Sequence, residues 1–104
     1  MKIQVNAPFQ VTDQMQGAID EKIGKLKTYF DRIVEAEVYL KIGEKRHRHR
    51  EQIVEIRLNV PGTTLFAEDR SDAVEKALAG AAEKARRQLV KYKKQFSGNH
   101  QKES

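Results

Sequence analysis

Two long stretches in which apolar and polar residues alternate place the tightest limits on the fold. Residues 34–42 carry Val, Ala, Val, Leu and Ile at every second position, and residues 54–60 carry Val, Ile, Leu and Val in the same way. A period of two residues is typical of a β-strand with one buried and one exposed face. The chain is therefore expected to build a sheet whose apolar side is covered by other elements.

Two shorter strands are expected to complete this sheet. Residues 2–7 alternate in the same manner and end at Pro8. Pro61-Gly62 favours a tight turn directly after the second long strand, so residues 63–68 are expected to return as a fourth strand. The inward-facing residues of these two short strands are expected to be Ile3, Val5, Leu65 and Ala67.

Two segments have apolar residues spaced three and four positions apart, the pattern of an amphipathic helix. The first is expected to begin at an N-cap formed by Thr12. The second is expected to begin at a cap formed by Ser71, with Asp72 in the first turn and Glu68-Asp69 assisting. The apolar stripes are Met15, Ile19, Ile23, Leu26 and Phe30, and then Val74, Ala77, Leu78, Ala81, Ala85, Leu89, Tyr92 and Phe96.

The predicted class is therefore α+β, in the order β-α-β-β-β-α. A four-stranded sheet would have both helices packed on its apolar face. The 104 residues are enough for one small domain, which we place at residues 1–96, and the small polar residues 97–104 are expected to form a disordered tail. The opposite face of the sheet can stay in water, because it would carry Gln4, Asn6, Glu35, Glu37, Tyr39, Glu55 and Arg57.

The charge of the chain is concentrated near its C-terminal end. Residues 84–104 carry 7 Lys/Arg and 1 Asp/Glu, whereas residues 1–83 carry 13 and 14, so the net charge of +5 comes from the last fifth of the chain. Residues 84–94 alone hold six basic residues and no acidic one. Charge separated in this way is the electrostatic footprint expected of a protein that binds a polyanion.

At 3.6 residues per turn, five of these cations fall within an arc of about 80° on the second helix, opposite its apolar stripe. Arg86 and Lys93 lie on a flank of that arc, and Lys22 and Lys25 of the first helix would extend it if the helices lie side by side. We call the whole set the basic ridge, namely Lys22, Lys25, Lys76, Lys84, Arg86, Arg87, Lys91, Lys93 and Lys94.

A solvated helix face is the simpler interpretation of the basic ridge, since Lys and Arg favour helices and stabilise their C-terminal ends. These preferences explain two or three of the cations. They do not explain six cations with no acidic residue to pair with, because like charges along a helix repel each other. A polyanion is therefore the favoured ligand. A membrane surface is a weaker candidate, because Tyr92 and Phe96 are expected in the core and leave no apolar wedge.

A second basic cluster, residues 45–50, joins the two long strands. It is either a solvated hairpin loop or strand end, or a further RNA contact through Lys45, Arg46, Arg48 and Arg50. His47 and His49 have no evident third ligand nearby, so a metal site is not expected.

Several functional classes lack support in the sequence. The chain has no Cys, no signal-like or membrane-spanning apolar run, no glycine-rich phosphate loop, no HExxH motif and no nucleophile elbow. Glu35, Glu37 and Glu55 form an acidic group on the sheet, which Lys41 and Arg57 can neutralise. We therefore expect a cytoplasmic protein that is not an enzyme and uses no cofactor.

Four segments resemble one known family, the ribosome hibernation-promoting factors, also called ribosome-associated inhibitor or sigma-54 modulation proteins. The most specific is residues 84–93, KARRQLVKYK, which is similar to the family pattern KLERQLxKxK. The others are Lys22-Ile23-Gly24-Lys25-Leu26, then Val54-Glu55-Ile56, and then Leu65-Phe66-Ala67-Glu68 followed by Ser71-Asp72. Two departures are Arg86, where the family usually has Glu, and Ala73-Val74, where it often has Met-Tyr.

The resemblance implies a fold similar to a double-stranded-RNA-binding domain. It also implies binding to small-subunit rRNA in the mRNA and tRNA channel of the ribosome, which silences translation under stress or in stationary phase. The rRNA phosphates would be contacted by Lys22, Lys25, Lys84, Arg87, Lys91 and Lys94. The chain length is similar to that of the short form of the family, which implies a monomer off the ribosome and a separate small ribosome modulation factor as a possible partner.

Two alternatives from the residues remain open. The chain is also compatible with a general structured-RNA-binding domain without ribosome preference, or with a module that docks acidic protein partners through the second helix.

Overall fold

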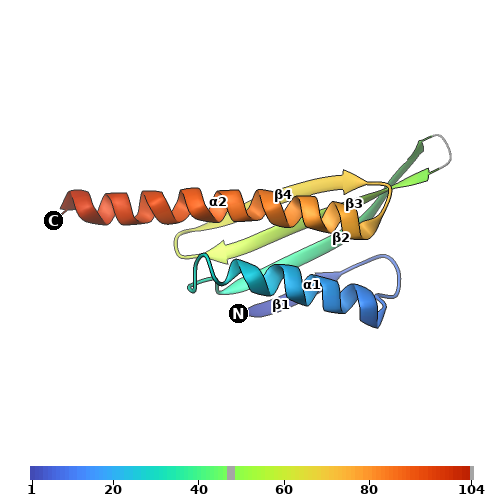
Figure 1. The fold of residues 1–104 in the computed structure, drawn as a ribbon, viewed down its shortest axis with the longest axis horizontal. Coiled ribbons are helices and arrows are strands. Elements are labelled where there is room, and N and C mark those ends of the chain that lie inside the picture. The colour runs from blue at the N-terminus through green and yellow to red at the C-terminus, as the bar shows by residue number, and fades with distance from the viewer. Residues whose placement is uncertain (47–48, 104) are drawn as a thin grey trace.

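The computed structural model describes residues 1–46 and 49–103 and confirms the predicted α+β fold (Figure 1). In chain order the elements are β1 (Lys2–Asn6), α1 (Asp13–Leu26), β2 (Glu35–Arg46), β3 (His49–Val60), β4 (Thr63–Ser71) and α2 (Val74–Glu103). The strands form one sheet in the order β1-β2-β3-β4, with β1 parallel to β2 and the other neighbours antiparallel.

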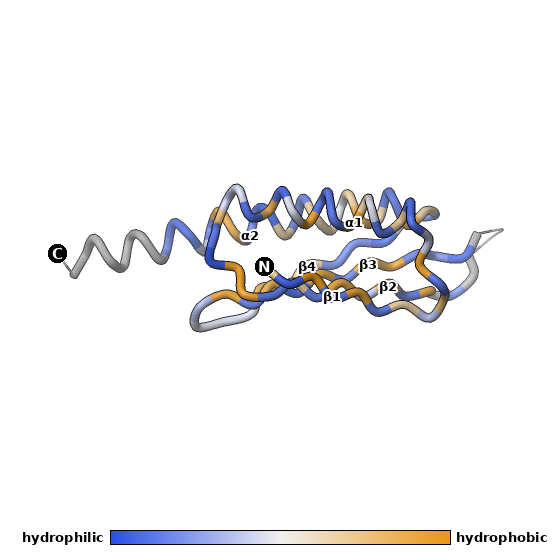
Figure 2. Tube along the Cα trace, turned by 90° about the horizontal axis from the view of Figure 1, so that it is seen from below, coloured by the Kyte–Doolittle hydropathy of each residue, from blue (hydrophilic) through white to orange (hydrophobic). Residues whose placement is uncertain are grey.

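The two helices lie side by side and form one layer over one face of the sheet (Figures 1 and 2). The alternating apolar residues of β2 and β3 meet in register, as Val38 opposite Ile56 and Leu40 opposite Val54. They are buried beneath the helix stripes, where Ile19, Ile23, Leu78 and Leu89 are also buried. Alanine residues at positions 77, 81 and 85 let α2 approach the sheet closely.

The turn between β3 and β4 is bonded to α2. Val60 pairs with Thr63 across the two-residue turn, and Gly62 takes a φ of 85°, which glycine adopts without strain. The Tyr92 hydroxyl donates a hydrogen bond to the Pro61 carbonyl at 2.5 Å, and its ring meets the Phe30 ring edge-on at 5.3 Å. The expected place of Tyr92 against the core is confirmed, whereas the Phe96 side chain lies outside the described side chains.

The two long strands extend further than predicted and include the ends of the basic segment 45–50. After an irregularity between Ile42 and Lys45, Lys45 pairs with Arg50 and Arg46 pairs with His49. Of the two structural alternatives, the strand end is therefore observed for these residues; residues 47–48 lie outside the described part.

The predicted start of the second helix is wrong, while that of the first is confirmed. The Thr12 side chain accepts a hydrogen bond from the Met15 N–H at 3.1 Å, as an N-cap does. Ser71, by contrast, is the last residue of β4, opposite Gln52, and α2 begins at Val74. The extra residues of β4 continue the ladder with β3, so the segment from Glu68 to Ser71 is strand and not a cap.

At its other end, α2 extends to Glu103 and so includes residues 97–103, for which the sequence predicts a disordered tail. Gly98 is the one strong helix breaker in that stretch, and a glycine costs a helix interior about 1 kcal/mol relative to alanine. A cost of that size does not by itself end a helix that already has six turns behind it.

The side chain of Gln88 on α2 covers the outer edge of β4. Its Oε1 accepts a hydrogen bond from the Phe66 N–H at 3.3 Å, and its Nε2 donates one to the Phe66 carbonyl. Unpaired edge groups can recruit a strand from another molecule, so this amide protects the edge as well as joining helix to sheet.

We expect Gln88→Ala to lower the free energy of unfolding by about 1–2 kcal/mol, because two hydrogen bonds are lost. Gln88→Glu is the matched control: it keeps an acceptor for the Phe66 N–H but loses the donor to the Phe66 carbonyl, so an intermediate loss is expected. Urea unfolding of the three proteins measures the difference. Equal midpoints for Gln88→Ala and the wild type would contradict a stabilising role.

Candidate nucleic-acid interface

Most of the α2 part of the basic ridge lies on the side of the helix that faces away from the sheet. Ala81, Ala85 and Leu89 are buried on the inner side, whereas Arg87, Lys91 and Lys94 are exposed on the outer side. The helix thus docks through its apolar stripe and presents its cations to solvent, as the helical spacing predicts.

The N-terminal half of this row is ion-paired, which corrects the expectation that these cations have no acid to pair with. Glu83 contacts both neighbouring arginines, at 2.6 Å from Arg86 and 3.5 Å from Arg87. Lys76 pairs with Asp72 at 3.3 Å. The prediction failed because Glu83 lies directly before the acid-free segment 84–94, within one turn of both arginines.

These pairs keep their acids charged but leave the cations accessible. The hydrogen bond and charge of Arg86 hold the pKa of Glu83 below its ordinary value, and the hydrogen bond from Lys76 does the same for the pKa of Asp72. Exposed ion pairs of this kind contribute little stability. A phosphate can therefore replace the carboxylate at small cost.

Lys84 is held by a contact between α2 and β4. Its Nζ lies 3.2 Å from Asp69 Oδ1 and 3.0 Å from the Glu68 carbonyl oxygen. A Cβ at position 80, one turn earlier on α2, would lie 1.6 Å from Asp69 Oδ2, so a larger residue there would displace this carboxylate from its observed position. Gly80 thus allows Asp69 to sit against the helix and reach Lys84.

The C-terminal half of the row differs, because Lys91, Lys93 and Lys94 are exposed and make no ion pair with any described residue. No carboxylate in that part of the chain offsets their charge by direct contact. The unopposed positive charge of the ridge therefore lies in the part of α2 beside the β3–β4 turn, where Tyr92 bonds Pro61.

The first helix adds to the same surface. Lys22 and Lys25 line a hollow of about 170 Å³ together with Glu83 and Arg86 of α2, which confirms that the two helices bring these cations together. Lys25 also pairs with Glu21 at 3.4 Å.

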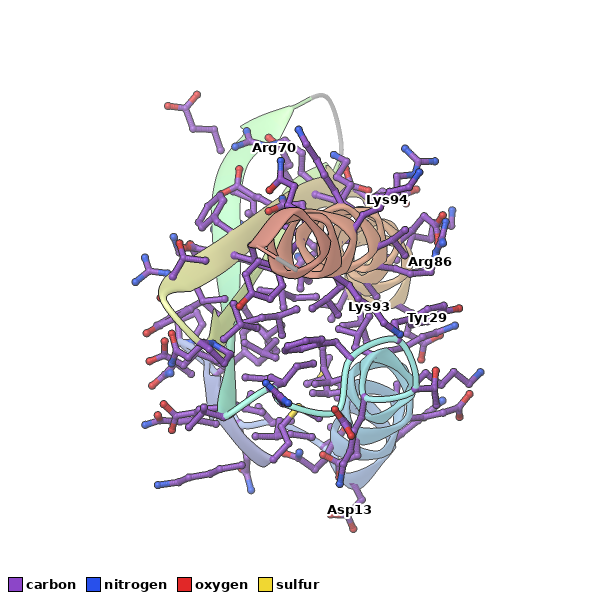
Figure 3. The ribbon with its side chains drawn as sticks, turned by 90° about the vertical axis from the view of Figure 1, so that its left-hand side faces the viewer. Asp13, Tyr29, Arg70, Arg86, Lys93 and Lys94 are labelled. Atoms are coloured by element: carbon purple, nitrogen blue, oxygen red, sulfur yellow. The ribbon has the colours of Figure 1, made fainter. Side chains whose placement is uncertain are left out.

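One further residue of this surface was not predicted. Tyr29, in the turn after α1, is 38% exposed, and the Arg86 guanidinium lies 5.7 Å from the centre of its ring. Figure 3 shows Tyr29, Arg86 and Lys93 on the side of the molecule where α1 and α2 face each other. The neighbouring Phe30 belongs to the predicted apolar stripe of the first helix. Tyr29 does not, so the helical spacing gave no indication of a functional role for it.

The second basic cluster is not brought next to the unpaired lysines. Lys45, Arg46 and Arg50 belong to the outer end of the β2–β3 hairpin, at the opposite end of the molecule from the C-terminus of α2 (Figure 1). Arg48 and His47 lie outside the described residues. Any contact by this cluster would therefore be separate from the basic ridge.

In the acidic group on the open face of the sheet, Lys41 and Arg57 pair with Glu55, whereas Glu35 and Glu37 make no ion pair with a described residue. Glu55 is 2% exposed and lies 2.5 Å from Lys41 Nζ and 2.8 Å from Arg57. Burial alone would raise the pKa of Glu55, but the hydrogen bonds and charges of the two cations outweigh it and hold the pKa below its ordinary value. Such a carboxylate stays ionised and is suited to a structural role.

Two other kinds of site have no counterpart in the described residues. No group of three or more His, Asp or Glu side chains there is arranged to hold a metal ion. None of the helices in that part of the chain combines the length and apolar character that a membrane span requires.

The chain is similar to proteins of the ribosome. A family model described as sigma 54 modulation protein / S30EA ribosomal protein matches residues 3–97. A ribosome hibernation promotion factor of Deinococcus radiodurans is 34% identical over 92 residues, which is 88% of this chain and 48% of that protein. One from Staphylococcus aureus is 32% identical over 83 residues, 80% of this chain and 43% of that protein. The chain thus spans about half the length of these relatives.

Solved structures show the same fold. A ribosomal subunit interface protein from Coxiella burnetii superposes with a TM-score of 0.79 at 23% identity, covering 89% of this chain and 98% of that one. The N-terminal domain of Protein Y from Thermus thermophilus gives a TM-score of 0.76 at 21% identity, covering 88% of this chain and 99% of that one.

Proposed function

Because the chain belongs to the sigma 54 modulation protein / S30EA ribosomal protein family, we propose that it is a ribosome hibernation factor that binds the small ribosomal subunit. It binds small-subunit rRNA in the channel used by mRNA and tRNA, and so silences translation under stress or in stationary phase. It acts in the cytoplasm by occupying this channel, without catalysis or a cofactor. The names of the two curated relatives and of the Coxiella structure support this proposal.

The observation that carries the proposal is the basic ridge, above all Lys91, Lys93 and Lys94, which make no ion pair with a described residue. Each cation that meets a phosphate releases bound counterions, which makes the affinity fall steeply with salt. Lys22, Lys25, Lys76, Lys84, Arg86 and Arg87 add contacts where phosphates displace the existing carboxylate partners. A rigid helix presenting cations along one side suits folded rRNA, whose phosphates are fixed in space.

A competition experiment tests this function. Purified small subunits and a plain RNA duplex are offered to the labelled protein over a range of salt concentrations. We expect preferential, salt-dependent binding to the subunit, competition by mRNA and initiator tRNA, and arrest of initiation in a translation extract. Comparable affinities for the duplex and the subunit would instead support a general structured-RNA-binding domain. Binding unaffected by mRNA and tRNA would contradict the proposed channel position.

A further inference from the structure

We infer that Tyr29, with Val90, Lys93 and Lys94, forms a stacking site for one unpaired RNA base beside the phosphate-binding ridge. This inference rests on the proposed function and deepens it, because it adds recognition of a base to binding of the backbone. The ring of Tyr29 is left partly exposed to solvent by the fold.

The exposure of Tyr29 follows from the turn that ends α1. Phe30 turns inward, is 7% exposed and meets the ring of Tyr92, so the preceding side chain has to point outward. The Thr28 hydroxyl donates a hydrogen bond to the Lys25 carbonyl at 2.6 Å, and the Tyr29 N–H bonds the Leu26 carbonyl at 3.0 Å. The ring is therefore presented by an ordered turn.

Beside this ring lies a hollow of about 420 Å³, lined by Thr28, Tyr29, Val90, Lys93 and Lys94. Its volume is within the range of sites that hold small ligands. Val90 is 42% exposed and supplies a second apolar surface. Lys93 also lines the adjoining hollow of about 360 Å³ together with Tyr29, so cations border the aromatic ring on more than one side.

Arg86 adds a further element on α2. Its guanidinium is held by Glu83 and lies over the Tyr29 ring, and both residues line the smaller hollow between the helices. Since Tyr29 also lines the larger hollow, where Arg86 is absent, the ring has surface left for another flat group. A cation on an aromatic ring and a base stacked on it are compatible contributions to nucleic-acid binding.

The chemistry of the hollow fits a nucleotide better than other anions. A base offers a flat apolar face to Tyr29 and Val90, while its phosphates can reach Lys93 and Lys94, which make no ion pair with the described residues. An acidic peptide would use the lysines but not the ring. In an RNA duplex the base faces are already stacked, so the occupant has to be a base in a single strand, loop or bulge.

The test uses a short single-stranded oligoribonucleotide with one 2-aminopurine, whose fluorescence falls when it stacks, and the same strand in a duplex. We expect quenching with the wild type and with Tyr29→Phe, which keeps the ring. Tyr29→Ala should abolish quenching and weaken binding about 5- to 100-fold, as expected for one lost base–aromatic stack. Phe66→Ala removes an exposed aromatic from the other face of the sheet and is expected to change neither signal.

The salt dependence separates stacking from a merely structural role. Tyr29→Ala should leave the log–log salt slope unchanged, whereas Lys93→Gln should reduce it by about one. A reduced slope with Tyr29→Ala would mean that the ring only positions Arg86, and would overturn the stacking site. So would equal binding by Tyr29→Ala and the wild type, or equally tight, Tyr29-dependent binding of polyglutamate.

Small-subunit binding is measured in parallel, so that the two proposals fail separately. If Tyr29→Ala binds subunits as tightly as the wild type and with the same salt dependence, the stacking site is wrong and the proposed function stands. If the wild type quenches the single strand but does not bind subunits, the proposed function is wrong.

Discussion

Reversing the charge of Lys91 and Lys94 together is expected to weaken small-subunit binding about 100-fold or more near physiological salt. Each lost phosphate contact removes about 0.9 from the log–log salt slope, which at ~0.1 M salt is nearly a factor of ten in affinity. Glutamate in place of lysine adds repulsion to that loss. These two lysines make no ion pair with a described residue, so their full charge is available to phosphate. Sedimentation with small subunits over a salt series measures both quantities.

Two single variants are the controls for this experiment. Lys2→Glu changes the net charge as much as Lys91→Glu does, but on β1, at the edge of the sheet. Lys76→Glu reverses a cation that Asp72 already neutralises in part. We expect little change with Lys2→Glu and a smaller loss with Lys76→Glu than with Lys91→Glu. Equal losses of affinity for Lys2→Glu and Lys91→Glu would show that binding depends on the net charge alone and not on the position of the cations in the basic ridge.

Glu55→Gln is expected to lower the free energy of unfolding by about 1–3 kcal/mol at neutral pH, because hydrogen bonds from two cations to a buried carboxylate are weakened. Lys41 and Arg57 are themselves about half exposed, so they can turn to water and limit the loss. The substitution lies on the sheet face opposite the helices. RNA binding by the folded variant should therefore be unchanged.

The pH dependence of this effect has a definite sign. The pKa of Glu55 in the folded protein is below its ordinary value of 4.5, so the ionised form stabilises the fold. That stabilisation is complete above the ordinary value and is lost as the pH falls through the folded pKa. The difference between wild type and Glu55→Gln should therefore shrink below about pH 4.5.

Urea unfolding at several pH values measures the Glu55 effect, with Glu37→Gln as control on the same face. Glu37 is only partly buried and accepts one long hydrogen bond, at 3.4 Å from the Tyr39 hydroxyl. Its substitution should have only a small effect on the free energy of unfolding. A difference between wild type and Glu55→Gln that stays constant down to pH 3 would contradict the lowered pKa.

Periodic patterns predicted most of the fold, because burial on one face repeats regularly along each element. The alternation in β2 and β3 was enough to place the sheet. The apolar stripes, which include Ile19 and Ile23 in α1 and Leu89 in α2, were enough to place both helices. The outward row of cations on α2 follows from the same helical geometry. Thr12 was a reliable cap because its interaction is local, three residues along the chain.

Contacts between distant segments could not be predicted in this way. Asp69 and Lys84 meet only because β4 passes under α2, and the sequence offered Asp69 as a cap instead. Glu55 is buried and bound by Lys41 and Arg57, although its position alternates with core residues and so predicted an exposed face. Tyr29 lies off the apolar stripe that Phe30 continues, and helical spacing alone does not predict that its ring meets Arg86 of α2.

The closeness of Gly80 to Asp69 has a consequence for how this sequence can change over evolutionary time. A side chain at position 80 and the Asp69 carboxylate in its observed position exclude each other in space, so the two positions should not drift independently. A lineage that acquires alanine at 80 would have to turn the Asp69 side chain away or replace it, and either change would disturb the ion pair with Lys84. Glycine at 80, aspartate at 69 and lysine at 84 should therefore be inherited as one unit, and lost as one.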